Sequence, residues 1–254
     1  MLGALADVVL ILITVACSLA TMMLLNRFWP FEKRKAHNDL IGWHLGVLGT
    51  TYAVILGFML YTVWTNFGAA SVNAEAEANA LVNIHRLARG LPEPQRSEMR
   101  ALAVEYANDV VKNGWPEAAR GVISPESSRT SRKMWQTLMS IQSPSWTQIT
   151  SEDHALYELS TLTEHRQIRQ LEVTSRLPAV LWCVLLIGGV LTIFSACLFG
   201  QENAFIHGIQ VLSFSFLIAL VLVAIADIDR PFQGSVHVND SAFTRAQVNM
   251  QSEP

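Results

Sequence analysis

The chain has 254 residues, of which 51% are hydrophobic and 15% are charged, and its formal net charge at pH 7 is −3. Soluble domains carry about 25% charged residues, so this composition excludes an ordinary soluble domain. The small net charge gives no indication of nucleic acid as a partner.

Four apolar blocks, in chain order, cover residues 8–25, 40–64, 177–199 and 204–226. A block of about 18 or more such residues is long enough to cross the hydrocarbon core of a bilayer as a helix. Residues 1–7 contain no lysine or arginine, which favours a membrane anchor over a signal peptide for the first block. We therefore predict an all-α integral membrane protein with four transmembrane helices.

The loop after the first block, "NRFWPFEKRK", is basic. Its cations are Arg27, Lys33, Arg34 and Lys35. The positive-inside rule places such a loop in the cytoplasm and therefore places the polar region between the second and third blocks outside. Arginines near the membrane ends of that polar region favour the opposite arrangement, so its side stays open.

The second block carries two stripes at helical spacing. The small residues Gly42, Gly46, Gly49, Ala53 and Gly57 form one face, and small residues let helices pack closely in lipid. The other face is polar at its ends and apolar in its middle, and includes Thr51, Ile55, Met59, Thr62 and Asn66. It is interpreted either as a pore lining with a hydrophobic constriction or as a helix packed on both sides within a bundle.

Residues 67–176 are predicted to form a helical extramembrane domain inserted between the second and third spans. Its first helix continues out of the second span, because Ala, Leu and Glu favour helix, and ends near Gly90. A second helix is expected to end at residues 113–114, a loop over 120–133, a short helix over 134–141, and a long helix from Thr150 or Ser151 to about residue 176.

Four residues of the domain's first helix share one face. They are Glu75, Asn79, Asn83 and Arg86. Such a face predicts either an ion vestibule or inter-subunit polar network, or a solvated surface with favourable pairs along the helix.

The fourth span ends in "AIADIDRPFQG". Carboxylates are unfavourable beside a helix C-terminus, where the helix dipole is negative. We therefore predict that Asp227, Asp229 and Arg230 form a latch between this end and the domain's first helix. The rest of residues 227–254 is predicted to be a C-terminal segment with a flexible tail.

Catalytic chemistry is not indicated. The sequence contains no nucleotide-binding or nucleophile motif and no metal-ligand spacing, so we predict no enzyme, no cofactor and no metal. The cysteines Cys17, Cys183 and Cys197 all lie in apolar blocks, which excludes a disulfide framework. No span has a charged residue in its interior, which disfavours an ion-coupled carrier.

Several segments together resemble a bacterial membrane family, formerly a domain of unknown function and now labelled bestrophin-like. They are "HNDLIGWHLGVLGTTYAVILGFMLYTVW", "EAEANALVNIHRLARGLP", "YANDVVKNGWP" and "DIDRPFQG". The resemblance implies likeness to bestrophins, pentameric anion channels with four membrane helices, an inserted cytoplasmic helical domain and a pore lined by the second helix. The acidic run with which animal bestrophins bind calcium is missing here.

The function predicted from these features is an oligomeric, passive, chloride-type anion channel in the bacterial inner membrane. Its partners would be inorganic anions, the lipid bilayer and copies of itself, five by resemblance. Residues 1–66 would hold spans one and two, 67–176 the domain, 177–226 spans three and four, and 227–254 the tail. The alternative is a membrane-anchored structural or sensory protein whose domain binds a partner, with no transport.

Overall fold

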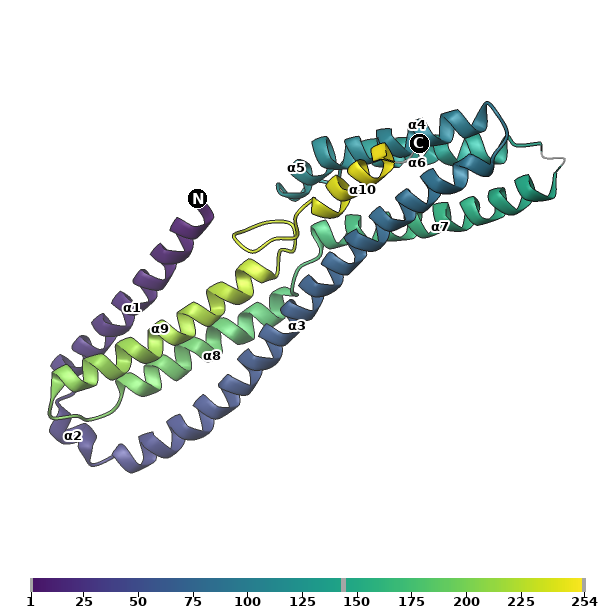
Figure 1. Cartoon of the computed structure of the whole chain (residues 1–254). Coiled ribbons are helices and arrows are strands. Elements are labelled where there is room, and N and C mark those ends of the chain that lie inside the picture. Colours follow the sequence, from purple (N-terminus) through teal and green to yellow (C-terminus); the bar gives the residue numbers. More distant parts are fainter. Residues whose placement is uncertain (1, 143–144, 253–254) are drawn as a thin grey trace. The chain divides into compact units, whose positions relative to one another are not determined.

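The protein, described by a computed structural model, has helices as its only regular elements over residues 2–142 and 145–252, the part that the structure describes (Figure 1). Four helices have the length and composition of membrane spans: α1 (Leu2–Phe28), α3 (Asn38–Leu87), α8 (Ala179–Cys197) and α9 (Ala204–Ile228). This confirms the predicted all-α class with four transmembrane helices.

The chain forms two compact units, each described by itself. The first, here the membrane unit, comprises Met1–Thr65 and Arg176–Asp229. The second, here the helical unit, comprises Asn66–Ser175 and Arg230–Pro254. Helix α3 belongs to both and is unbroken, which confirms that the first helix of the inserted domain continues out of the second span.

In the membrane unit, α1 packs along α9, and α8 contacts both helices. Tyr52 of α3 reaches α8, where its hydroxyl donates to the carbonyl of Leu185 at 2.8 Å. A Cβ atom at Gly188 would lie 2.6 Å from the Tyr52 ring. The glycine therefore makes room for the ring, and this contact holds α3 against α8 inside the apolar core.

A second tie joins the two loops of the membrane unit. The short helix α2 (Phe31–Lys35) presents a fully buried Arg34, which donates to the carbonyl of Cys197 at the end of α8 at 3.0 Å and to the side chain of Asn26. The side chain of Asn38 exchanges two hydrogen bonds of 2.9 Å with the backbone of Gly200. Because cations are favourable at a helix C-terminus, Arg34 stabilises the end of α8.

The helical unit contains the second half of α3 and several further helices. They are α4 (Gln95–Asp109), α5 (Trp115–Ala118), α6 (Glu126–Met139), α7 (Trp146–Thr174) and α10 (Ser241–Ser252), with a 3-10 turn η1 (Ala88–Gly90) and a π turn η2 (Val110–Gly114). The core is a continuous apolar cluster that includes the fully buried Leu81, Met99 and Leu159. Small buried residues of α3, among them Ala74 and Ala78, line this core.

Three details of the predicted domain were wrong. More than half of the expected loop over 120–133 belongs to α6, whose buried face includes Ser127, Thr130 and Ser131. These small polar residues concealed the helical period. Helix α7 begins one turn earlier than predicted, because the Ser145 hydroxyl accepts a hydrogen bond from the Gln148 N–H. In place of a flexible tail, α10 buries Phe243 in the core.

We expect Gly200→Ala to destabilise the membrane unit by about 2 kcal/mol or more. The new Cβ atom would lie 2.5 Å from the backbone nitrogen of Lys35, and a backbone atom cannot rotate away. Gly208→Ala is the matched control, since its Cβ atom would lie 3.9 Å from the nearest atom, in Met22. Thermal unfolding in detergent measures both variants; equal midpoints would contradict the close approach.

Candidate functional site

The predicted pore-lining residues lie on one face of α3. Thr51 and Thr62 are exposed, and their hydroxyls donate to carbonyls one turn earlier, at 2.9 and 2.8 Å. Ile55 and Met59 are half-buried at the edge of the apolar cluster formed with α8 and α9. Asn66 is exposed and begins the helical unit. The stripe is thus accessible on a single chain, and its role as a pore lining stays a prediction.

The small-residue face of α3 is largely open. Cβ atoms at Gly46, Gly49 and Gly57 would meet no atom within 4 Å, whereas one at Gly42 would lie 3.4 Å from the Phe199 ring. Within one chain, therefore, only Gly42 of these four packs against another side chain. The other three leave a smooth strip that a further helix can approach closely.

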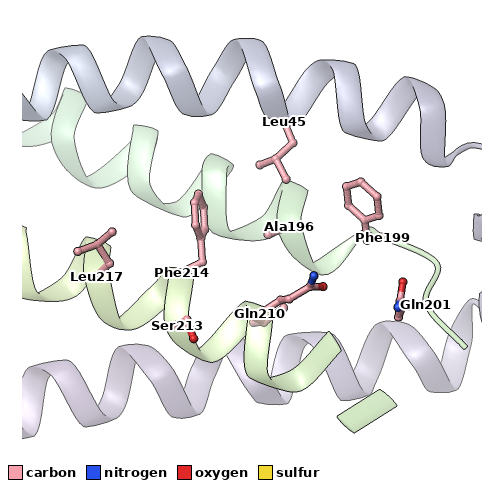
Figure 2. Close-up of a pocket in the computed structure, with 9 residues that line it drawn as sticks. Leu45, Ala196, Phe199, Gln201, Gln210, Ser213, Phe214 and Leu217 are labelled. Atoms are coloured by element: carbon pink, nitrogen blue, oxygen red, sulfur yellow. The ribbon is translucent and has the colours of Figure 1, made fainter. Parts of the chain in front are cut away.

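A groove of about 550 Å³ lies between α3, α8 and α9 in the membrane unit (Figure 2). Leu45 lines it from α3, and the carboxamide of Gln210 projects into it from α9 (Figure 2). The neighbouring His207 is buried and bonds the Ala196 carbonyl at 3.2 Å. A second, apolar groove of about 280 Å³ shares Phe214 and also includes glycines of the open strip. Grooves therefore separate α3 from α9 over several turns.

The four residues predicted as a vestibule or polar network do not converge on one partner. Glu75 forms an ion pair with Arg245 of α10, and the exposed Asn79 lines the same shallow groove. Asn83 donates to Glu158 of α7 at 3.1 Å. Arg86 is exposed. Their role in a vestibule or between subunits stays a prediction.

Sequence reasoning missed the central polar contact of the helical unit, the buried ion pair between Glu77 and Arg169. The guanidinium of Arg169 on α7 donates to both carboxylate oxygens of Glu77 on α3, at 2.7 and 2.9 Å. The Tyr106 hydroxyl donates to the same carboxylate at 2.6 Å. The guanidinium carbon also lies 5.5 Å from the Trp115 ring centroid and 5.9 Å from that of Phe243.

Arg169 keeps its positive charge in the fold. Burial lowers the pKa of Arg169, but the Glu77 carboxylate outweighs it, so that the pKa of Arg169 lies above its usual range. Burial, with the charge of Glu77, raises the pKa of Tyr106 well above its usual value. The spacing of residues in the sequence could have indicated that Glu77 is buried. Glu77 follows Ala74 by three residues, which places both on the same, core-facing side of a helix.

A second polar cluster lies beside the pair. The Asn73 side chain donates to the His165 carbonyl at 2.9 Å, and its oxygen lies 2.6 Å from the His165 Nδ1 atom. Because an amide oxygen only accepts, Nδ1 is the donor. The nearby Glu172 has a buried Oε2 atom with no partner among the described residues. Burial raises the pKa of Glu172 to about 7, and the charge of Arg169 opposes that rise.

The predicted latch residues lie where α9 ends. Both carboxylate oxygens of Asp229 accept from the N–H of Leu177, at 3.0 and 3.3 Å, so Asp229 ties the end of α9 to the residues that precede α8. Arg230 is exposed and begins the helical unit. The expected link from Asp227, Asp229 and Arg230 to the domain's first helix stays a prediction. No group of metal-binding side chains occurs among the described residues.

We expect the thermal stability of the protein to fall as pH rises from about 4.5 to 7. Unfolded Glu172 ionises near 4.5 whereas the folded group ionises near 7, so its contribution is present at low pH and is lost as pH passes 7. Glu172→Gln should reduce the loss of unfolding free energy between pH 5 and pH 8 by about 1–2 kcal/mol, after allowance for solvent screening of a half-buried group. Unfolding midpoints at pH 5 and 8 measure it; Glu164→Gln, at an exposed site of α7, is the control. Identical slopes in all three proteins would contradict the assignment.

We also expect Asp229→Ala to lower the unfolding midpoint and weaken assembly, because the Leu177 N–H loses its acceptor at a cost of about 1–3 kcal/mol. Glu202→Ala is the control: it removes an exposed ion pair with Lys35, and such pairs contribute little. Thermal unfolding and size-exclusion chromatography in detergent measure both. An Asp229→Ala protein as stable and as fully assembled as the control would count against the tie.

Comparison with solved structures finds the same fold in a bacterial bestrophin homologue from Klebsiella pneumoniae. A variant with one substitution has a TM-score of 0.72 at 11% identity, covering 94% of this chain and 97% of that chain. The form solved by zinc anomalous phasing has a TM-score of 0.68 at 13% identity, with the same coverage. At such identities the similarity establishes the fold alone.

The sequence itself carries the family assignment. None of the curated proteins matches the chain. The model of the Bestrophin-like domain matches residues 12–243, which is most of the sequence. This match confirms the resemblance seen in the sequence motifs, and the chain belongs to the Bestrophin-like family.

Proposed function

We propose that the chain is one subunit of an oligomeric passive channel for anions of the chloride type, with α3 lining the pore. Family membership supports the class of function, since bestrophins are anion channels rather than enzymes. The observation that carries the assignment to α3 is its accessible face, on which Thr51 and Thr62 flank Ile55 and Met59.

The chemistry of this face suits a weakly interacting anion. Residues 40–64 contain no Asp, Glu, Lys or Arg, so no ring of carboxylates would repel anions. The two threonine hydroxyls supply polar ends, whereas Ile55 and Met59 form an apolar neck between them. A neck of this kind controls conduction by dewetting.

A pore along α3 requires several copies of the chain, and we propose a homo-oligomer, a pentamer by resemblance to bestrophins. The open strip at Gly46, Gly49 and Gly57 supports close helix packing between subunits. The grooves beside α3 support the same view, because the carboxamide of Gln210 needs a hydrogen-bond partner in lipid.

We propose the bacterial inner membrane as the location, with the helical unit in the cytoplasm. The basic loop favoured the opposite side, but Arg34 is buried against carbonyls and Lys35 pairs with Glu202. Arg34 therefore does not face lipid headgroups, whereas Lys35 is exposed but paired with Glu202, and the bias from this loop is weaker. Arg86 and Arg230 on the helical unit are exposed and count toward the cytoplasmic side.

The second candidate function is a membrane-anchored structural or sensory protein. The observation in its favour is a pair of exposed aromatic side chains on α7, Trp146 at 85% and Tyr157 at 69%. Exposed aromatics of this kind are frequent in protein–protein contacts. In this reading, the spans only anchor and oligomerise the helical unit.

Purified protein in liposomes should conduct chloride, and the double variant Ile55→Ala, Met59→Ala should conduct it severalfold faster. Shorter side chains widen and wet the neck. Val54→Ala is the matched control, because Val54 is an exposed apolar residue on a different side of α3. Chloride efflux with a valinomycin shunt measures all three. Zero flux in every form, with normal assembly, would contradict the channel and favour the anchored protein.

A further inference from the structure

We propose that two loops of the helical unit rest in the phospholipid headgroup layer and make a peripheral membrane contact. The loops are residues 119–125, between α5 and α6, and residues 230–238, after α9; together they are called the loop pair. The partner is a lipid surface. The proposal requires only that α9 spans the membrane and does not depend on conduction.

The two loops are held together. The side chain of Gln233 donates to the Ala118 carbonyl at 3.4 Å, and a Cβ atom at Gly121 would lie 2.7 Å from the same Gln233 amide. Gly121 also has a φ of +75°, which favours glycine. On the other side of the second loop, the Trp115 indole donates to the Val238 carbonyl at 3.0 Å. The loop pair is therefore one ordered surface.

This surface combines apolar tips with positive charge. Val122, Ile123 and Val236 are 52%, 46% and 45% exposed. The loop pair contains no Asp or Glu, and its Arg120 and Arg230 are exposed. Apolar side chains beside cations suit the interface between acyl chains and lipid phosphates.

Short lengths of chain connect this surface to the membrane spans. Arg230 follows directly on the membrane unit, whose last helix is the α9 span. Because an extended chain spans at most about 3.6 Å per residue, Val236 lies within roughly 22 Å of Arg230. Trp115, which holds the second loop, lies 5.5 Å from Arg169. Arg169 precedes Ser175, the last residue before the third span's unit, by only about 9 Å of helix. Within the helical unit, the loop pair thus lies close to the two points at which the chain connects to α8 and α9.

The same unit contains a natural control. Met139 is 67% exposed and ends α6, whereas Ile123 lies shortly before α6 begins. The 14 residues of α6 separate the two positions by about 20 Å. Exposure and apolar character are similar, so location is the main difference.

Spin labels test the contact on the full chain. Single cysteines at Ile123, Val236 and Met139 are introduced in a Cys17→Ser, Cys183→Ser background, which leaves only the buried Cys197. The labelled proteins are placed in nanodiscs of phosphatidylethanolamine and phosphatidylglycerol. Power saturation then compares label accessibility to oxygen, which partitions into lipid, and to a water-soluble nickel chelate. Val122→Cys is a second site on the first loop should one labelled variant fold poorly.

We expect the labels at 123 and 236 to be more accessible to oxygen than to nickel, and the label at 139 to show the reverse. Nickel accessibility at 123 and 236 equal to that at 139 would show loops in water and overturn the proposal. Low accessibility to both reagents would show a protein–protein contact, such as a second copy, and would overturn it equally. Because no ion flux is measured, this outcome is independent of the channel proposal.

Discussion

The ion pair between Glu77 and Arg169 joins the two helices by which the inserted unit is connected to the spans. Helix α3 enters that unit from the second span, and α7 ends shortly before the third. With both groups buried and both carboxylate oxygens bonded, removing either partner would leave a buried charge at a cost of about 3–5 kcal/mol. The pair therefore sets how α3 and α7 meet, and the surrounding aromatic rings of Trp115 and Phe243 pack on that junction.

The membrane half of α3, in contrast, is not held by a buried ion pair. Residues 40–64 carry no charge. The specific attachments of this half include the Tyr52 hydroxyl on the α8 backbone and the Asn38 amide on Gly200. Its threonine hydroxyls are satisfied within the helix, so its accessible face demands no fixed partner. One continuous helix is thus anchored firmly at one end, while the face of its membrane half remains available to lipid, to further copies or to a permeating ion.

Features that depend on a single helix or a single apolar block could be predicted from the sequence. The four spans follow from apolar length, and the continuation of α3 follows from Ala, Leu and Glu in place of any helix breaker. Features that depend on a partner distant in sequence could not be predicted. Ser127, Thr130 and Ser131 are typical of a loop, but they lie on the helix face that packs against α4 and α7. The C-terminal segment forms helix α10 because Phe243 is buried in the core.

By itself, then, the sequence determined the membrane class, the number of spans, the family motifs and the stripes along the second span. Periodicity and hydropathy are local properties, which is why one chain without partners reveals them. Only the tertiary structure decided that Arg169 pairs with Glu77, that Asp229 accepts from the backbone N–H of Leu177, and that Arg34 is buried against Cys197. Each of these depends on which backbone or charge lies opposite, between 52 and 163 residues away, and helical spacing does not identify that distant partner.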